Sequence, residues 1–111
     1  MIDGIYRVTF SSSSNDFGDG IVVIKGDTIN GGDHGYLYSG TKSIQGGQIS
    51  SSLTIKQWNP SVQSIFGPNK EFVLELSGDV SADNGFVVHG HVAGHSQEKI
   101  TIRGRYLSAA A

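Results

Sequence analysis

The chain has 111 residues, and its 8 lysines and arginines against 10 aspartates and glutamates give a formal net charge of −2. This length predicts one domain. The slightly acidic balance argues against a nucleic-acid binder, which needs a basic stripe, and against adsorption to anionic lipid. The absence of cysteine excludes disulfide bonds, thiolate metal sites and cysteine nucleophiles.

Signals for membranes and export are also missing from the sequence. No apolar run approaches the roughly 18–20 residues of a membrane-spanning helix. Residues 1–4 have neither the basic nor the apolar region of a secretory signal. We therefore expect a cytoplasmic protein with no membrane partner and no nucleic-acid partner.

The pattern along the chain predicts strands almost throughout. Sixteen glycines and frequent serines disfavour helices, and turn residues recur every 8–12 residues or so, a spacing typical of a sandwich or barrel. In chain order, the predicted strands are residues 4–10, 18–25, a short strand around 28–29, then 35–42, 48–57, 71–77, 86–93 and 98–107.

One segment, residues 59–68, predicts a short helix between the fifth and sixth strands. It opens with Asn59 as N-cap and Pro60 at the first helical position, and it closes with a glycine. Its apolar side chains at positions i, i+3 and i+4 are Val62, Ile65 and Phe66. Residues 1–107 are thus interpreted as a single domain, and residues 108–111 as a disordered tail, with an origin in the expression vector as one reading.

The eight strands must hide their edges, and closure into a barrel hides all of them. A two-sheet sandwich is the alternative. Gly40, Gly90 and Gly104 fall inside predicted strands, and they favour the barrel because strongly coiled strands need bends or bulges at such positions. We predict an all-β fold, an eight-stranded antiparallel up-and-down barrel.

Catalytic and metal-binding patterns are weak. His89 and His91 lie at i and i+2 of a predicted strand and so share one face, but no further residue has a spacing that would complete a zinc site. No nucleophile elbow or serine triad stands out. We predict no catalytic residues, no metal site and no cofactor.

The aromatic residues and a few polar ones are the candidate ligand-binding residues. The aromatics either fill the core of a small barrel or line a ligand cavity. The polar ones either lie on a solvated strand face or anchor a ligand if that face turns inward. The candidates are Tyr36, Tyr38, Trp58, Phe66, His89, His91 and Arg103.

Several short motifs occur in a suggestive order. They are residues 3–6 (DGIY), 18–23 (GDGIVV), 29–33 (INGGD), 38–40 (YSG), 60–62 (PSV) and 89–94 (HGHVAG). Together they resemble the GrlR family, small bacterial negative regulators of type III secretion gene expression. The resemblance covers residues 3–106, nearly the whole chain.

The resemblance implies a lipocalin-like eight-stranded barrel that is usually dimeric and has no enzymatic activity. It also implies that the protein acts by binding a transcriptional activator rather than DNA. The founding regulator of the family carries a short acidic run between its fourth and fifth strands. Residues 43–48 hold no carboxylate here, so the acidic site is not carried over to this chain.

Three hypotheses about function remain. The first is a non-enzymatic regulatory protein, a homodimeric barrel that binds a transcriptional regulator or another protein partner. The second is a lipocalin-like carrier or sensor that holds a small apolar ligand inside the barrel. The third is an enzyme, and only the pair His89 and His91 supports it.

Overall fold

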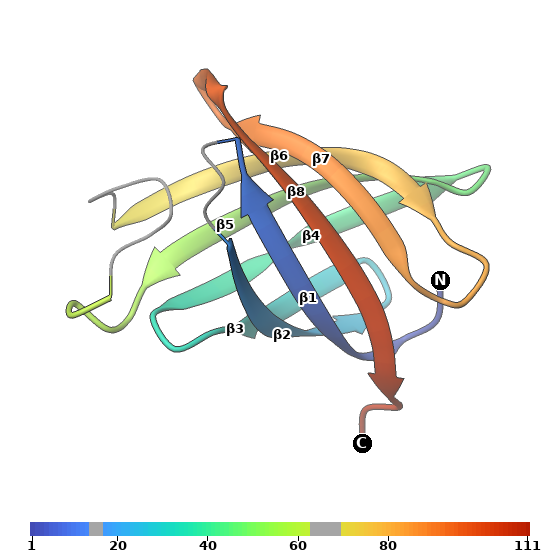
Figure 1. Ribbon diagram of the computed structural model, residues 1–111. Coiled ribbons are helices and arrows are strands. Elements are labelled where there is room, and N and C mark those ends of the chain that lie inside the picture. Colours follow the sequence, from blue (N-terminus) through green and yellow to red (C-terminus); the bar gives the residue numbers. More distant parts are fainter. Residues whose placement is uncertain (14–16, 63–69) are drawn as a thin grey trace.

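The computed structural model describes residues 1–13, 17–62 and 70–111, and these residues form eight strands. Figure 1 shows them wound around a common axis. The strands are β1 (Gly4–Ser12), β2 (Phe17–Lys25), β3 (Thr28–Gly32), β4 (Tyr36–Gln45), β5 (Gln48–Gln57), β6 (Glu71–Val80), β7 (Phe86–Val92) and β8 (His95–Ser108).

The sheet is a closed antiparallel barrel. Each strand pairs with the next one along the chain, and β8 pairs with β1 to close the ring. The predicted all-β barrel is confirmed, and the sandwich alternative is wrong. Ile5 is the register partner of Ser108 in the closing pair, so both termini lie at the same end of the barrel (Figure 1).

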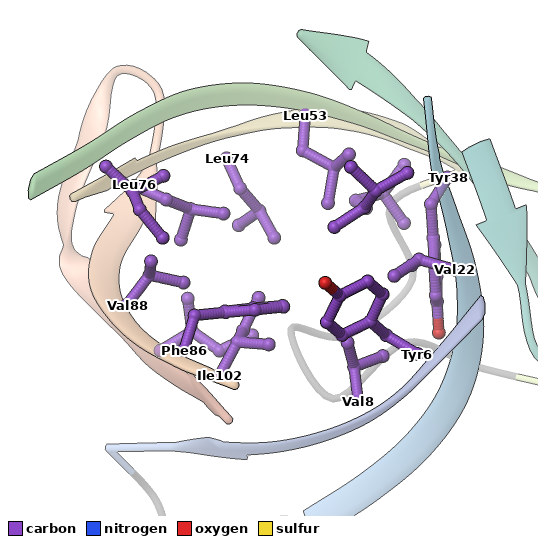
Figure 2. Close-up of a cluster of buried hydrophobic side chains, with 14 of the residues drawn as sticks. Tyr6, Val8, Val22, Tyr38, Leu53, Leu74, Leu76, Phe86, Val88 and Ile102 are labelled. Atoms are coloured by element: carbon purple, nitrogen blue, oxygen red, sulfur yellow. The ribbon is translucent and has the colours of Figure 1, made fainter. Parts of the chain in front are cut away.

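Side chains alternate between the two faces of each strand, and one face forms the core. In β1 the side chains of Tyr6 and Val8 are buried inside, whereas Arg7 between them is exposed. The same alternation runs around the barrel, and Figure 2 shows inner side chains from opposing strands pointing toward one another. Among the described residues, sixteen form the core: Tyr6, Val8, Val22, Ile24, Tyr36, Tyr38, Ile49, Leu53, Ile55, Leu74, Leu76, Phe86, Val88, Val92, Ile100 and Ile102.

Glycines in the strands allow the close approach that barrel curvature requires. A Cβ atom at Gly40 would lie 2.1 Å from the main-chain oxygen of Ser52, and one at Gly90 would lie 1.8 Å from that of Glu75. A Cβ atom at Gly104 would lie 2.0 Å from the ring of Phe86. These positions accept no side chain without a shift of their neighbours.

The connection between β5 and β6 differs from the predicted helix as far as the structure describes it. Asn59 forms a turn there: its carboxamide oxygen accepts from the amide of Ser61 at 3.1 Å, and its main-chain oxygen accepts from the amide of Val62 at 3.1 Å. This side-chain capping supports a turn as readily as a helix start. Residues 63–69, including Ile65 and Phe66, lie outside the described residues. Over the three described ranges, no helix has the length and apolar character to cross a membrane.

Candidate functional site

The barrel encloses a cavity of about 420 Å³. Inner-face side chains from all eight strands line it, and most of them are aliphatic or aromatic. Figure 2 shows two lining residues, Leu53 and Leu74, on one side of the barrel interior and a third, Val8, on the other. The volume lies within the range of roughly 300–1,000 Å³ found for small-molecule sites.

Several inner positions of the barrel carry no side chain. Gly40, Gly78 and Gly90 occupy inner positions of β4, β6 and β7, where the neighbouring backbone is too close for a Cβ atom. Eight strands give a barrel whose interior is just wide enough for side chains or one small ligand.

One end of the cavity is organised by Asp33, which follows β3. Its Oδ1 atom accepts from the amides of Gly35 and Tyr36, both at 2.8 Å, and its Oδ2 atom accepts from the hydroxyl of Tyr38. An aspartate that caps amides two and three residues ahead is a typical turn former. Burial, followed by the hydrogen bond to Asp33, raises the pKa of Tyr38 well above its ordinary value.

Lys42 and Ser51 also line the cavity, further along β4 and β5. The two residues are register partners on adjacent strands. The hydroxyl of Ser51 donates to the main-chain oxygen of Thr41 at 2.9 Å. The salt bridge found among the described residues joins Arg7 to Asp19, so within that part of the chain Lys42 has no ion-pair partner.

Three of the predicted aromatic residues are described, and they gather at the Asp33 end. Tyr36 and Tyr38 are buried, with 5% and 7% of their surface exposed, and both line the cavity. Trp58 follows β5 and is 52% exposed. Its indole Nε1 donates to the main-chain oxygen of Asp33 at 3.0 Å. Phe66 lies outside the described residues.

The three predicted polar anchors lie on the outer face. Arg103 and His89 are exposed, and His91 is half-buried at an outward position of β7. His89 Nδ1 is 3.0 Å from Thr101 Oγ1, also outside the barrel. The inward orientation on which their anchoring role depended is therefore not observed. Within the described ranges, no three His, Asp or Glu side chains gather into a group that could hold a metal ion.

The polar residues of the cavity lining are absent from the predicted ligand-binding residues. They are Asp19, Asp33, His34, Lys42 and Ser51. A signal for Lys42 was present. It lies four residues after Tyr38 in the predicted strand 35–42, so the period of two places its side chain on the same face as the tyrosine. Lysine is rarely buried unless it is paired, which made an inward position unexpected.

The outside of the barrel carries an apolar surface that we name the outer apolar face, formed by Ile21, Leu37 and Trp58. These side chains are 43%, 52% and 52% exposed. Gly32 lies between Ile21 and Leu37 as the register partner of both, so no side chain separates them. Trp58 lies next to Leu37 on this surface. Its amide donates to the main-chain oxygen of Gly35, two residues before Leu37, at 3.0 Å.

Comparison with known protein families decides the relationship that the short motifs suggested. The family described as T3SS negative regulator, GrlR, matches residues 1–110. The chain belongs to the GrlR family. A search of curated proteins found no match. The sequence resemblance to GrlR is thus confirmed over essentially the whole chain, and it places the protein in a family of negative regulators of type III secretion.

The turn between β4 and β5 is where the founding GrlR regulator is expected to carry its acidic run. In this GrlR-family chain the two strands are joined by Gly46 and Gly47 alone. Their φ angles of 58° and 82° are those of a tight two-residue hairpin turn. The turn itself therefore carries no carboxylate.

Proposed function

We propose that this GrlR-family chain is a non-enzymatic cytoplasmic regulator that acts as a homodimer. It binds a transcriptional activator of secretion genes and lowers their expression without contacting DNA. The family match supports negative regulation of type III secretion. The net charge of −2 supports a protein partner over nucleic acid.

The observation that carries the docking proposal is the outer apolar face. Because β8 closes on β1, every strand of the barrel has a neighbour on both sides, and we place the protein partner on side chains of the outer surface. Leu37 and Trp58 are large apolar side chains with about half of their surface in water, and Ile21 extends the surface across Gly32. Contiguous apolar surface of this kind is typical of interaction sites.

A promoter reporter tests this proposal. The chain is expressed in a type III secreting bacterium that carries a reporter gene behind a secretion promoter under activator control. We expect reporter output to fall with the natural chain and to be restored by Leu37→Asp. Ser39→Asp is the matched control, because Ser39 is an exposed residue on the same face of β4, and it should still repress. Equal repression by both variants would exclude the outer apolar face.

Dimerisation is tested separately by sedimentation velocity of the purified chain. A dimer is expected to have twice the monomer mass of 11.8 kDa across micromolar concentrations. A monomer at all concentrations would overturn the homodimer without affecting the reporter prediction.

A second candidate function is a carrier or sensor of a small apolar ligand. The observation that favours it is the cavity of about 420 Å³, whose lining is mostly apolar. Native mass spectrometry of the chain purified from its source is the test. A bound small molecule is expected, and a clean unliganded mass from source cells and from two expression hosts would count against the carrier.

A further inference from the structure

We infer that the barrel binds an amphiphile with one apolar chain and a carboxylate head, and that the carboxylate contacts Lys42 and Ser51. The inference rests on the carrier function proposed above and adds the chemical class and the orientation of the ligand. It depends on three features of the cavity: an apolar body, a cation without a partner at one end, and an acid at the other.

The body of the cavity selects the apolar chain. Between its two polar ends the lining consists of side chains such as Leu53, Leu74, Val88 and Ile102. Figure 2 shows these residues pointing into the interior of the barrel from facing strands. Water held there would find few hydrogen-bond partners, whereas an aliphatic chain would gain contacts with the lining and remove apolar surface from water.

Lys42 selects the charge of the head group. Its side chain leaves β4 on the same face as Tyr36 and Tyr38, which line the cavity with it. Among the described residues it has no ion-pair partner. An ammonium held beside this apolar lining would lose part of its hydration, so a carboxylate that pairs with it would be favoured more strongly there than in water.

Ser51 provides a second contact beside Lys42. Its hydroxyl proton is donated to the main-chain oxygen of Thr41, and the hydroxyl oxygen retains acceptor capacity. With a carboxylate bound, the hydroxyl is free to turn and donate to it instead. Lys42 and Ser51 together therefore offer one ionic contact and one hydrogen bond, which is a small anchor of the kind that orients ligands in apolar pockets.

The acidic residue at the opposite end determines the orientation. Asp33 lines the cavity and accepts from the Tyr38 hydroxyl, whereas Asp19 at the border of the cavity is exposed and paired with Arg7. Tyr38 and Lys42 are four residues apart on one strand, which separates them by about 13 Å. An anionic head is repelled from the Asp33 end and attracted to the Lys42 end, so the apolar tail extends toward Tyr38.

A different arrangement would place the Lys42 ammonium in water, with only the aliphatic stem covering the end of the cavity. In that case the chain would bind apolar tails with no preference for the head group. Matched probes separate the two arrangements. Dodecanoate, dodecan-1-ol and dodecylamine share one tail and carry an anionic, a neutral and a cationic head at pH 7.5.

The experiment is calorimetric titration of the full chain with the three probes at concentrations below micelle formation. We expect dodecanoate to bind at least 10-fold more tightly than dodecan-1-ol, and dodecylamine to bind most weakly. Lys42→Met is expected to remove this preference while leaving dodecan-1-ol affinity within 3-fold. Lys42→Arg should retain the preference for dodecanoate. Lys56→Met, at an exposed lysine on β5, is the control that should change nothing.

A second readout reports the ionic contact directly. In carbon-13 spectra of carboxyl-labelled dodecanoate, the pKa of the bound carboxyl should lie below that of the free acid, because a nearby ammonium favours the charged form. Lys42→Met should abolish this difference. If the three probes bind equally, the head-group inference is overturned and the carrier function survives. If none of the three binds, both are overturned.

Discussion

Trp58 on the outside of the barrel and Asp33 at the end of its cavity are joined by a hydrogen bond of 3.0 Å from the indole Nε1 to the main-chain oxygen. The side chain of Asp33 accepts in turn from the hydroxyl of Tyr38, which lines the cavity. A single residue thus connects the outer apolar face with the interior. Because Trp58 is the one tryptophan in the chain, its fluorescence reports on this connection.

Replacing Asp33 should destabilise the fold. Asp33→Ala removes the acceptor of two amides and of the Tyr38 hydroxyl, and leaving such groups without partners costs about 1–3 kcal/mol each when they are buried. We expect the free energy of unfolding in urea to fall by about 2 kcal/mol or more. Asp79→Ala, at an exposed position of β6, should change it by less than about 0.5 kcal/mol. Equal effects of the two variants would contradict the role given to Asp33.

Stability should decline at alkaline pH through Tyr38. Burial raises its pKa in the folded protein, so the folded state holds its proton when the unfolded chain, with a tyrosine pKa of about 10, loses it. The stabilisation of the folded state by this raised pKa is complete below pH 10. As the pH rises above 10, this stabilisation is lost at up to about 1.4 kcal/mol per pH unit. Urea unfolding from pH 8 to pH 11 measures this slope.

Tyr38→Phe should make the alkaline decline shallower, although it lowers stability at pH 8 by removing the hydroxyl that Asp33 accepts from. Tyr6→Phe should also reduce the slope, because burial raises the pKa of Tyr6 as well. A slope above pH 10 that is the same in the natural chain and in Tyr38→Phe would refute the assignment.

Adding one methyl group at Gly90 should be costly. The Cβ atom of Gly90→Ala would lie 1.8 Å from the main-chain oxygen of Glu75 on the neighbouring strand, so β6 and β7 would have to separate. We expect destabilisation of about 1–3 kcal/mol, measured by thermal and urea unfolding. Ser77→Ala, an exposed change on β6 next to the same strand pair, should be nearly neutral. A stable Gly90→Ala protein would mean that the strands are less closely packed than the structure shows.

Two valines of β7 test whether the interior is hollow. Val88 lines the cavity, so Val88→Ile places its extra methylene in empty space and should stabilise the protein by about 0.5–2 kcal/mol. Val92 is 2% exposed and is not part of the cavity lining, so Val92→Ile overpacks the core and should destabilise by about 1–3 kcal/mol. The same loss of stability in both variants would show a filled interior.

The strands were predictable from the sequence because each depends on local information. In β5, apolar Ile49, Leu53 and Ile55 alternate with serines and lysine, and this period of two defines a strand with one buried face. Gly46 and Gly47 mark the hairpin turn before it. The in-strand glycines were expected at bends or bulges and correctly indicated a barrel over a sandwich. The structure gives a different reason for the glycines at Gly40 and Gly90, namely the short distance between neighbouring backbones.

The candidate site was predicted less well, since it depends on which face of each strand turns inward. Arg103 and Lys42 lie in strands whose two faces alternate regularly and both contain polar residues. The sequence alone therefore does not show which face turns inward. Arg103 faces outward and Lys42 lines the cavity. The connection after Asn59 illustrates a second limit, because an asparagine cap followed by proline begins a turn as well as a helix.

By itself, the sequence determined the all-β class, the eight strands, the hairpin turns and the membership of the GrlR family, because alternation, turn residues and ordered motifs are local properties of the chain. Only the tertiary structure decided the inside and the outside of the barrel, the hollow at its centre and the opposite charges of its two ends. Those features arise when β8 closes on β1 and fixes the register of all eight strands at once. Closure is a long-range event, and no single segment carries the information for it.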